Sequence, residues 1–268
     1  MDAQREPASN GAAGERDDRD SRDGQEGREE PLAAGAPGAA DTPSAVAVVI
    51  PAHNEASRIA LTVLAARRLP GVDLVVVVDA ASTDSTARVA EESGAVVVRL
   101  GGKVGRTAAL LRGIGQVADV DLPGTAPRHL LLLDADLQQS AGEAVRLLDP
   151  VLAGKADLVL AGAEPREASA ARGASRFARR GIVRATGFTA TRPLAAELCL
   201  TRAAFSAAEP LSEGSGAGPG LIIDLLRQGF RVVEIPVPWD HRASRSGLRA
   251  RLREARRRRE VRRALASR

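Results

Sequence analysis

The sequence has one cysteine, very few aromatic residues and no long hydrophobic run, and each absence excludes a class of protein. Cys199 alone can form neither an intrachain disulfide nor a cysteine-rich metal site. No apolar stretch approaches the roughly 20 residues that span a bilayer, and the charged start of the chain lacks the apolar segment of a signal peptide. We therefore expect a cytoplasmic protein.

The composition also argues against a nucleic-acid partner. Aromatic residues make up 2% of the chain, which leaves no platform on which bases could stack. Lysine occurs only at Lys103 and Lys155, so nearly all positive charge is arginine, yet the net charge is only +4. We attribute the arginine excess to the codon usage of a GC-rich genome.

Local composition divides the chain into three parts. Residues 1–44 are rich first in charged residues and then in alanine, glycine and proline, which predicts a disordered segment. Residues 45–242 are long enough for one α/β domain with a sizeable core. Residues 243–268 form a strongly basic tail that we expect to be helical.

Short β-rich runs alternate with helical ones through the central part. Strands are expected at 45–50, 74–78, 95–100, 130–133, 157–161, 197–202 and 231–237. Helices are expected from Ser57 to about residue 68, then at 85–94, 106–117, 142–152 and 219–228, with 168–186 either helical or mobile. This alternation predicts an α/β fold with a Rossmann-like, mostly parallel sheet flanked by helices.

Two carboxylates directly follow the strand expected at 130–133. Four leucines there are typical of a strand buried on both faces, so Asp134 and Asp136 leave the sheet together. Ligands of open α/β sheets bind outside the carboxyl ends of strands, where Mg²⁺ or Mn²⁺ prefers carboxylates plus substrate phosphates. Because Asp is also common in simple strand-end turns, the motif indicates a metal site only together with its surroundings.

Polar residues also follow the first and second strands. Asn54 and Glu55 lie after the first, and Asp79, Ser82 and Asp84 lie after the second. Parallel strands would bring both loops to the edge that carries the aspartate pair, where a carboxylate can accept hydrogen bonds from a ribose diol. The alternative is that these residues only cap helices, which is worth about 0.5–2 kcal/mol each.

Lys103 and His241 each have two interpretations. Lys103 lies just before an expected helix start, where anions bind, and it either contacts a nucleotide or is simply solvated. The glycines around it do not have P-loop spacing. His241 follows the last strand and is either a further metal ligand or an exposed loop residue.

Five motifs in this order resemble the family 2-like glycosyltransferases of the GT-A fold. They are Val48-Val-Ile-Pro-Ala-His-Asn-Glu55, Val76-Val-Val-Asp-Ala-Ala-Ser-Thr-Asp84, Gly102-Lys103, Asp134-Ala-Asp136-Leu137 and Glu234-Ile-Pro-Val-Pro-Trp-Asp-His241-Arg242. The segments 192–205 and 214–224 are further similar to the bacterial glucosyl-3-phosphoglycerate synthases. The resemblance covers residues 45–242 and implies the GT-A fold and a nucleotide-sugar donor, for which we expect UDP-glucose.

The resemblance also implies roles for individual residues. Asp79 and Glu55 would hold the nucleoside, Asp136 with His241 would bind Mg²⁺ or Mn²⁺, and Asp134 would lie near the sugar. The implied donor-binding set is Pro51, Ala52, Asn54, Glu55, Asp79, Ser82, Lys103, Asp134 and Ala135. The candidate catalytic carboxylates are Asp134, Asp136, Glu197 and Asp224; the last two are either a base or structural, and the resemblance favours retention of configuration without a dedicated base.

The sequence departs from the family pattern at three places. Ala80 and Ala81 stand where relatives usually have Asp-Gly, so one carboxylate and one glycine are missing. Ala195-Ala196 replaces Ser-Gly, and Gly218 stands where an acidic residue is common. We therefore expect a donor site that is retained and an acceptor site that is altered.

These observations predict a glycosyltransferase that moves a sugar from a nucleoside-diphosphate sugar to an anionic or phosphorylated small acceptor. One alternative is transfer to a polyprenyl phosphate, with the basic tail and its interspersed Leu248, Leu252, Val261 and Leu265 lying on an anionic membrane. The tail could instead pack on the domain. A second alternative is a nucleotide-sugar-binding protein without turnover, and a homodimer is compatible with each.

Overall fold

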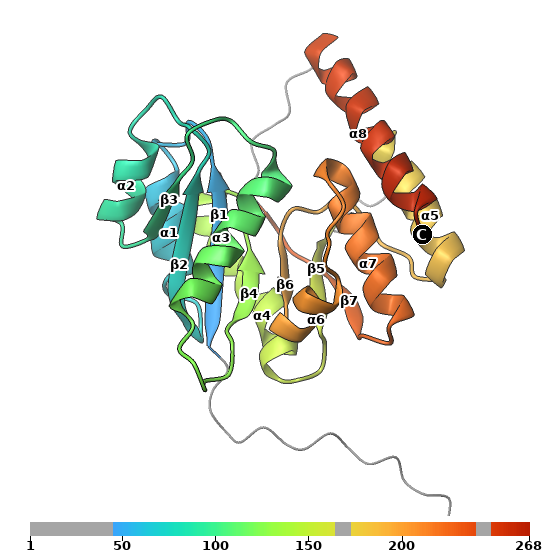
Figure 1. Ribbon diagram of the computed structural model, residues 1–268, viewed down its shortest axis with the longest axis horizontal. Helices are drawn as coiled ribbons and strands as arrows, with labels where there is room; N and C mark the ends of the chain where they lie inside the picture. The colour runs from blue at the N-terminus through green and yellow to red at the C-terminus, as the bar shows by residue number, and fades with distance from the viewer. Residues whose placement is uncertain (1–44, 164–172, 240–247) are drawn as a thin grey trace, which may run out of the picture. The chain divides into compact units, whose positions relative to one another are not determined.

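The computed structural model describes residues 45–163, 173–239 and 248–268. These residues contain a seven-stranded sheet with the order β3-β2-β1-β4-β6-β5-β7 (Figure 1). The strands are β1 (Val46–Ala52), β2 (Val72–Asp79), β3 (Val96–Arg99), β4 (His129–Leu132), β5 (Leu158–Gly162), β6 (Leu198–Leu200) and β7 (Val232–Pro236). All paired strands are parallel except β6, which runs antiparallel to β4 and β5. The mostly parallel sheet expected from the sequence is confirmed.

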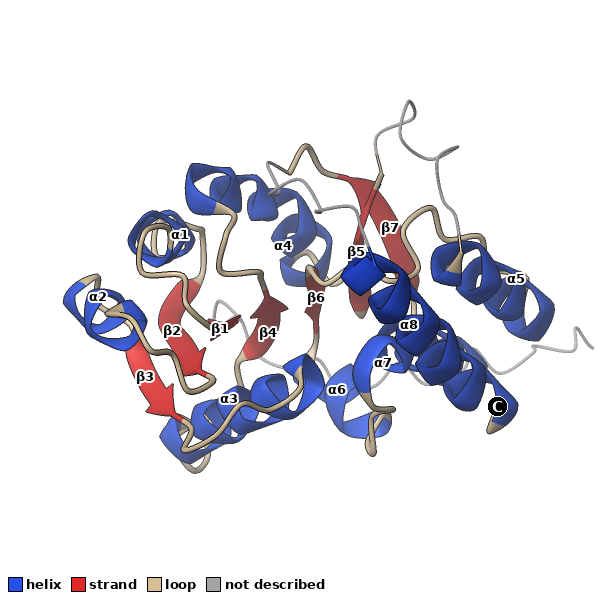
Figure 2. Cartoon of the chain, turned by 90° about the horizontal axis from the view of Figure 1, so that it is seen from above, coloured by secondary structure: helices blue, strands red, loops and turns tan. Residues whose placement is uncertain are grey.

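Helices cover both faces of the sheet. They are α1 (Ile59–Ala66), α2 (Thr86–Glu92), α3 (Arg106–Val120), α4 (Val145–Leu152), α5 (Ala174–Thr186), α6 (Arg202–Ala207), α7 (Ala217–Arg227) and α8 (Leu248–Ala266), with the 3₁₀ turns η1 (Gln138–Ala144) and η3 (Gly214–Gly216). Figure 2 shows α1 and α4 on one face and α3, α6 and α7 on the other.

The central strands are hydrophobic throughout because both of their faces are covered. Residues 46–50 of β1 and 130–131 of β4 have no exposed surface. Alternate residues of each strand enter two separate cores, one shared with α1, η1 and α4, the other with α3, α6 and α7. Such continuous apolar runs end only where the strands leave the sheet, which places the first polar residues at one edge.

Some expected helix boundaries are wrong. Ser57 does not cap α1, because the carbonyl of Glu55 already accepts the N–H groups of Arg58 and Ile59 in a tight turn and the helix begins at Ile59. The strand expected at 197–202 is only β6, since Thr201 caps a helix, α6, through a 3.1 Å hydrogen bond from the Ala204 N–H. The first three residues of the helix expected at 142–152 belong to the turn η1, and α4 begins at Val145.

The basic tail forms α8, which packs on α5, α7 and η3 (Figure 1). Val261 and Ala264 are buried in this contact, and Leu265 joins the second core, whereas Leu252 is 64% exposed. The structure therefore shows α8 packed on the domain, which is one of the two arrangements considered for the tail. Across the described ranges, no helix is both long enough and apolar enough to cross a membrane.

Gly113 lets α3 approach β1 and β2, and we predict that alanine there is destabilising. An added Cβ would lie 2.4 Å from Val49 Cγ1 and 2.8 Å from Val78 Cγ2. We expect Gly113→Ala to lower the free energy of unfolding by about 1–3 kcal/mol, as overpacking does. Gly115 of the same helix has open space at its Cβ. Denaturant unfolding of Gly115→Ala should show a gain of about 0.5–1 kcal/mol; equal effects of the two substitutions would contradict the close approach.

Candidate functional site

The parallel register brings three strand ends to one edge of the sheet. Ala52 at the end of β1 lies beside Asp79 at the end of β2, and the Ala80 N–H donates to the Ala52 carbonyl at 2.9 Å. On the other side of β1, the Leu133 N–H donates to the carbonyl of Val49 at 3.2 Å, so the Asp134–Asp136 turn leaves the sheet at the same edge. The edge therefore gathers the polar loops that the sequence predicted to converge.

The first two loops are tied together by side-chain hydrogen bonds. Asn54 donates its N–H to Ser82 Oγ at 2.9 Å and accepts the N–H of Thr83 at 2.8 Å through its Oδ1. His53 Nδ1 lies 2.9 Å from the carbonyl of Ala80. These contacts hold the loop after β1 and the loop after β2 as one unit.

Asp79 and Asp84 have different roles in the second loop. Asp79 is buried, and its Oδ1 accepts the hydroxyl and, at 3.3 Å, the N–H of Ser82. Asp84 lies at the start of α2, where hydrogen bonds from Thr86 lower its pKa. Asp84 therefore bonds the first residue of α2, while Asp79 lies at the strand end itself.

Glu55 lies between these loops and α1. Its N–H donates to Thr86 Oγ1 at 2.8 Å, and its carboxylate forms a 3.1 Å ion pair with Arg58. The Glu55 side chain is 18% exposed, so it remains partly accessible to solvent.

The turn that carries the aspartate pair is anchored to α1. Thr62 is fully buried, donates its hydroxyl to the Ala135 carbonyl at 2.8 Å and accepts the Gln138 N–H at 2.8 Å. Ala135 is buried beneath the turn, whereas Asp134 and Asp136 are half-buried. A single hydroxyl thus fixes the backbone on which both carboxylates stand.

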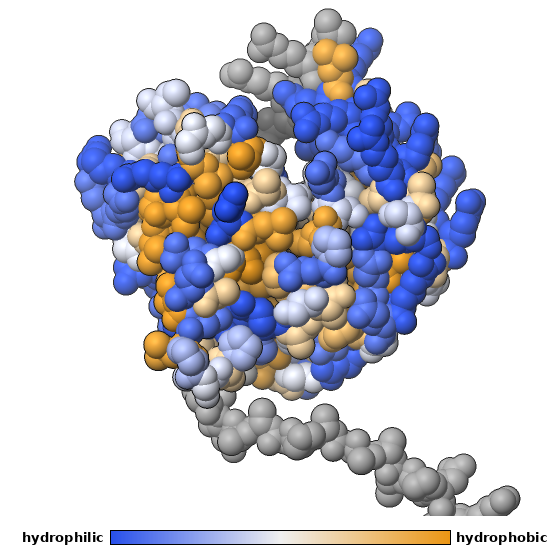
Figure 3. Space-filling model, in the orientation of Figure 1, coloured by the Kyte–Doolittle hydropathy of each residue, from blue (hydrophilic) through white to orange (hydrophobic). Residues whose placement is uncertain are grey.

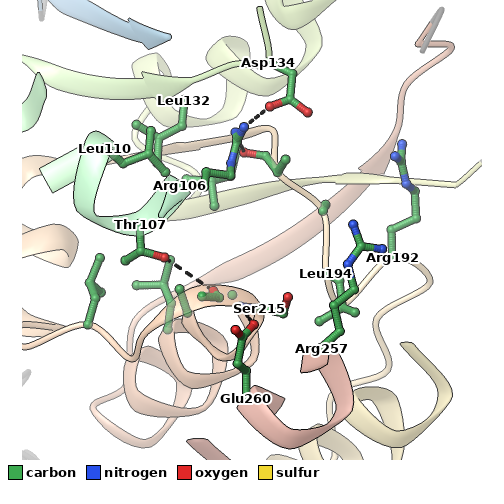
Figure 4. Close-up of a pocket in the computed structure, with 18 of the residues that line it drawn as sticks. Arg106, Thr107, Leu110, Leu132, Asp134, Arg192, Leu194, Ser215, Arg257 and Glu260 are labelled. Carbon is green, nitrogen blue, oxygen red and sulfur yellow. Dashed lines mark hydrogen bonds and ion pairs between the residues drawn. The ribbon is translucent and has the colours of Figure 1, made fainter. Parts of the chain in front are cut away.

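Arg106 at the start of α3 is a site residue that sequence reasoning missed. Its guanidinium forms an ion pair with Asp134 and donates to the Ala196 carbonyl at 3.1 Å (Figure 4). Burial lowers the pKa of Arg106, and the charges of Glu197 and Asp136 oppose that effect. The only sequence signal was its position at an expected helix start.

A cavity of about 720 Å³ opens next to Asp134, between α3, η3 and α8 (Figure 4). Its charged lining consists of Arg106, Arg192, Arg253, Arg256 and Arg257 together with Asp134 and Glu260. Leucine and other apolar side chains of β4, β6 and α7 form another part of its lining. The cavity therefore combines an apolar surface with an excess of guanidinium groups.

The segment that carries Arg192 is held by β7 and α5. The Glu234 carboxylate accepts the N–H groups of Thr191 at 2.6 Å and Arg192 at 2.8 Å. Arg179 donates to the carbonyl of Thr191 at 2.6 Å. This clamp fixes the cavity wall that continues to Ala195 and Ala196, the positions that depart from the family pattern.

Not every predicted site residue reaches the edge. The residues at that edge, in the last positions of the strands or in the loops that follow them, are Pro51, Ala52, Asn54, Glu55, Asp79, Ser82, Asp134, Ala135 and Asp136. Lys103 is exposed in the loop before α3. Glu197 is fully buried and does not line the cavity, and Asp224 of α7 forms an ion pair with Arg268 away from it. His241 lies outside the described residues.

Within the described ranges no three His, Cys, Asp or Glu side chains form a group that could hold a metal ion. A metal bound by Asp136 would therefore need oxygens from a ligand or a residue outside those ranges. This condition fits an ion shared with a bound diphosphate better than a structural metal.

Comparison with known proteins assigns the family. The model of glycosyl transferase family 2 matches residues 47–187, and the chain belongs to this family. Glycosyltransferase AglJ of Haloferax volcanii is 29% identical over 204 residues, which is 74% of this chain and 64% of AglJ. The chain thus spans less than two thirds of the length of AglJ.

Solved structures confirm the fold expected from the resemblance. A crystal structure of glucosyl-3-phosphoglycerate synthase from Mycobacterium tuberculosis is 26% identical, with a TM-score of 0.63 over 84% of this chain and 80% of that one. The same enzyme with Mn²⁺, UDP-glucose and phosphoglyceric acid is 25% identical, with a TM-score of 0.64 over 84% and 79%. The protein has the GT-A fold.

Ala81 occupies a left-handed backbone conformation, with φ at 56°, at the place where the family resemblance implies glycine. The Cβ atom makes this conformation unfavourable by about 1–2 kcal/mol, partly balanced by the greater unfolded-state freedom of glycine. We therefore predict that Ala81→Gly raises the free energy of unfolding by up to about 1 kcal/mol, measured by denaturant unfolding. A loss of stability would show that this loop does not hold the conformation described.

Proposed function

We propose that this protein transfers a hexose from a nucleoside-diphosphate sugar, UDP-glucose, to a hydroxyl of an anionic small acceptor. The observation that carries the proposal is the position of the arginine-lined cavity directly beside Asp134, at the edge where the loops after β1, β2 and β4 meet. A donor at that edge and an acceptor in the cavity would meet at Asp134. The solved relative bound to both UDP-glucose and phosphoglyceric acid supports separate places for a donor and an acceptor.

On the donor side, Asp79 and Glu55 would accept hydrogen bonds from the nucleoside, and the backbone of Pro51, Ala52 and Ala135 would border it. Asn54 and Ser82 would act by holding the two loops together, as their mutual hydrogen bond does. Lys103 is exposed near the start of α3 and could approach the diphosphate. The missing carboxylate at Ala80 leaves Asp79 as the acidic residue of this strand end.

The carboxylates after β4 fit a divalent cation. Asp136, together with His241, would hold Mg²⁺ or Mn²⁺, as solved relatives crystallised with Mn²⁺ or Mg²⁺ and UDP support. When bound, such a cation would neutralise the charge of the departing diphosphate. Thr62 would position the turn that presents Asp136, because its hydroxyl bonds the backbone of Ala135 before Asp136 and of Gln138 after it.

On the acceptor side, Arg106 and Arg192 would bind the anion. In the transfer, the bond from the anomeric carbon to the diphosphate oxygen breaks and a bond to the acceptor oxygen forms. The hydroxyl proton leaves with the diphosphate, which agrees with retention of configuration and needs no dedicated base. Glu197 then serves as a positioning residue for Arg106 rather than as a base, since it is fully buried behind the cavity wall.

We predict that Asp136→Asn weakens metal-dependent binding of UDP by about tenfold or more, because it removes the charge that would hold the cation. Calorimetric titration with UDP and Mn²⁺, repeated with EDTA, measures this. Asp119→Asn, an exposed carboxylate on α3, is the control and should bind UDP as the unchanged protein does. Equal affinity of Asp136→Asn and Asp119→Asn would refute the proposed metal site.

Turnover separates a transferase from a protein that only binds nucleotide sugars. We expect the purified chain to release UDP from UDP-glucose faster when 3-phosphoglycerate is added. Tight UDP binding without release, across a panel of phosphorylated acceptors, would instead support binding without turnover. GDP-mannose, titrated in parallel, identifies the base that the donor site accepts.

A further inference from the structure

The side of α8 that lines the cavity carries more positive than negative charge. Arg253, Arg256, Arg257 and Glu260 line the cavity at helical spacings of three and four residues, so they lie on one face of the helix. The hydrophilic surface over α8 is visible in Figure 3. Arg106 and Arg192 line the same cavity from the start of α3 and from the segment before β6.

The two acidic residues of α8 are both used to dock the helix. Glu254 accepts the N–H of Ala174 at the start of α5, and Glu260 accepts the N–H of Ser215 in η3 at 2.9 Å. Glu260 also pairs with Arg256 at 2.7 Å. Beyond these contacts, Val261 and Ala264 anchor the following turn in the domain. The helix is therefore held on both sides of its arginine-rich turns.

Among the residues that the structure describes, three arginines of the cavity have no carboxylate partner. Arg106 pairs with Asp134 and Arg256 pairs with Glu260. Arg192, Arg253 and Arg257 form no ion pair with any residue that the structure describes, and Figure 4 shows Arg192 and Arg257 in the same part of the cavity. Several like charges around one cavity attract an anion strongly, and a planar guanidinium binds phosphate through two parallel hydrogen bonds.

We propose that α8 is a wall of the acceptor site and that Arg253 and Arg257, with Arg192, bind a phosphate monoester of the acceptor away from the hydroxyl that receives the sugar. The inference rests on the proposed function, because it takes the cavity to be the acceptor site. It gives the basic tail a role in the enzyme: Arg253 and Arg257 line the cavity, whereas Arg258 and Arg262 of the same helix do not. A soluble phosphate ester is favoured over a lipid headgroup because the exposed Arg253 and Arg257 border the same open cavity that Arg106 and Asp134 line.

The test compares two pairs of arginines with the same spacing on the same helix. Arg253→Gln with Arg257→Gln removes the cavity-facing charge. Arg258→Gln with Arg262→Gln removes equal charge from exposed positions that do not line the cavity, and serves as the control. Each double variant of the full chain is titrated with 3-phosphoglycerate, with inorganic phosphate and, separately, with UDP and Mn²⁺.

We expect the cavity-facing variant to bind 3-phosphoglycerate about tenfold to a hundredfold more weakly, as loss of charged hydrogen bonds implies. The affinity of the cavity-facing variant for UDP should not change. The affinity of the control variant for 3-phosphoglycerate and inorganic phosphate should not change either. The proposal would be overturned if both variants lost the same phosphate affinity or if neither lost any. It would also be overturned if the unchanged protein bound neither 3-phosphoglycerate nor inorganic phosphate. If the unchanged protein does not bind UDP, but only the cavity-facing variant loses phosphate binding, the proposed donor is rejected. The proposed anion-binding role of α8 is then kept.

Vesicles distinguish the two sources of a phosphate monoester. Co-sedimentation with phosphatidylcholine vesicles, with and without phosphatidic acid, should show no difference between the two double variants. Selective loss of binding to phosphatidic acid vesicles in the cavity-facing variant would overturn the soluble acceptor and assign the same arginines to a lipid phosphate.

Discussion

The parallel register of β1, β2 and β4 determines where every polar side chain of the candidate site lies. These strands are buried on both faces, so their sequences stay apolar until each leaves the sheet. The backbone pairing of Ala52 with Asp79, and of Val49 with Leu132, makes the strands end at one edge. Gly113 then allows α3 to lie close to β1 and β2, which sets the start of that helix, and with it Arg106, next to the turn after β4.

The charges around this edge are separated into two sides. Asp79, Asp136 and Glu55 lie toward the loops after β1 and β2, whereas the arginines lie in the cavity beyond Asp134. Arg106 is at the boundary, influenced by Glu197 and Asp136 and paired with Asp134. An acidic side that can share a cation with a diphosphate, next to a basic side that can hold an anion, matches the two substrates proposed for the transfer.

The departures from the family pattern affect the two sides differently. Ala80 and Ala81 keep the backbone of the second loop, because Ala80 still bonds Ala52 and Ala81 still adopts the left-handed conformation. The loss there is chemical, one carboxylate, rather than a change of shape. Ala195 and Ala196 lie instead on the cavity wall, where the Ala196 carbonyl accepts from Arg106. Ala195 and Ala196 thus line the same cavity as the arginines of α8, which is the acceptor side in the proposed function.

Local sequence determined most elements of the fold and the strand-end motifs, although it did not predict α6. The strand runs, Asn54, Glu55, Asp79 and the aspartate pair could be predicted because each depends on a pattern within a few neighbouring residues. Arg106 could not, since its partner Asp134 lies 28 residues further along the chain. Nor could the contact of α8 with η3, which joins residues 45 apart. Only tertiary packing decided that Asp224 faces Arg268 and that arginines of the tail line the cavity, because periodicity shows which face of a helix is apolar but not which neighbour its charged face meets.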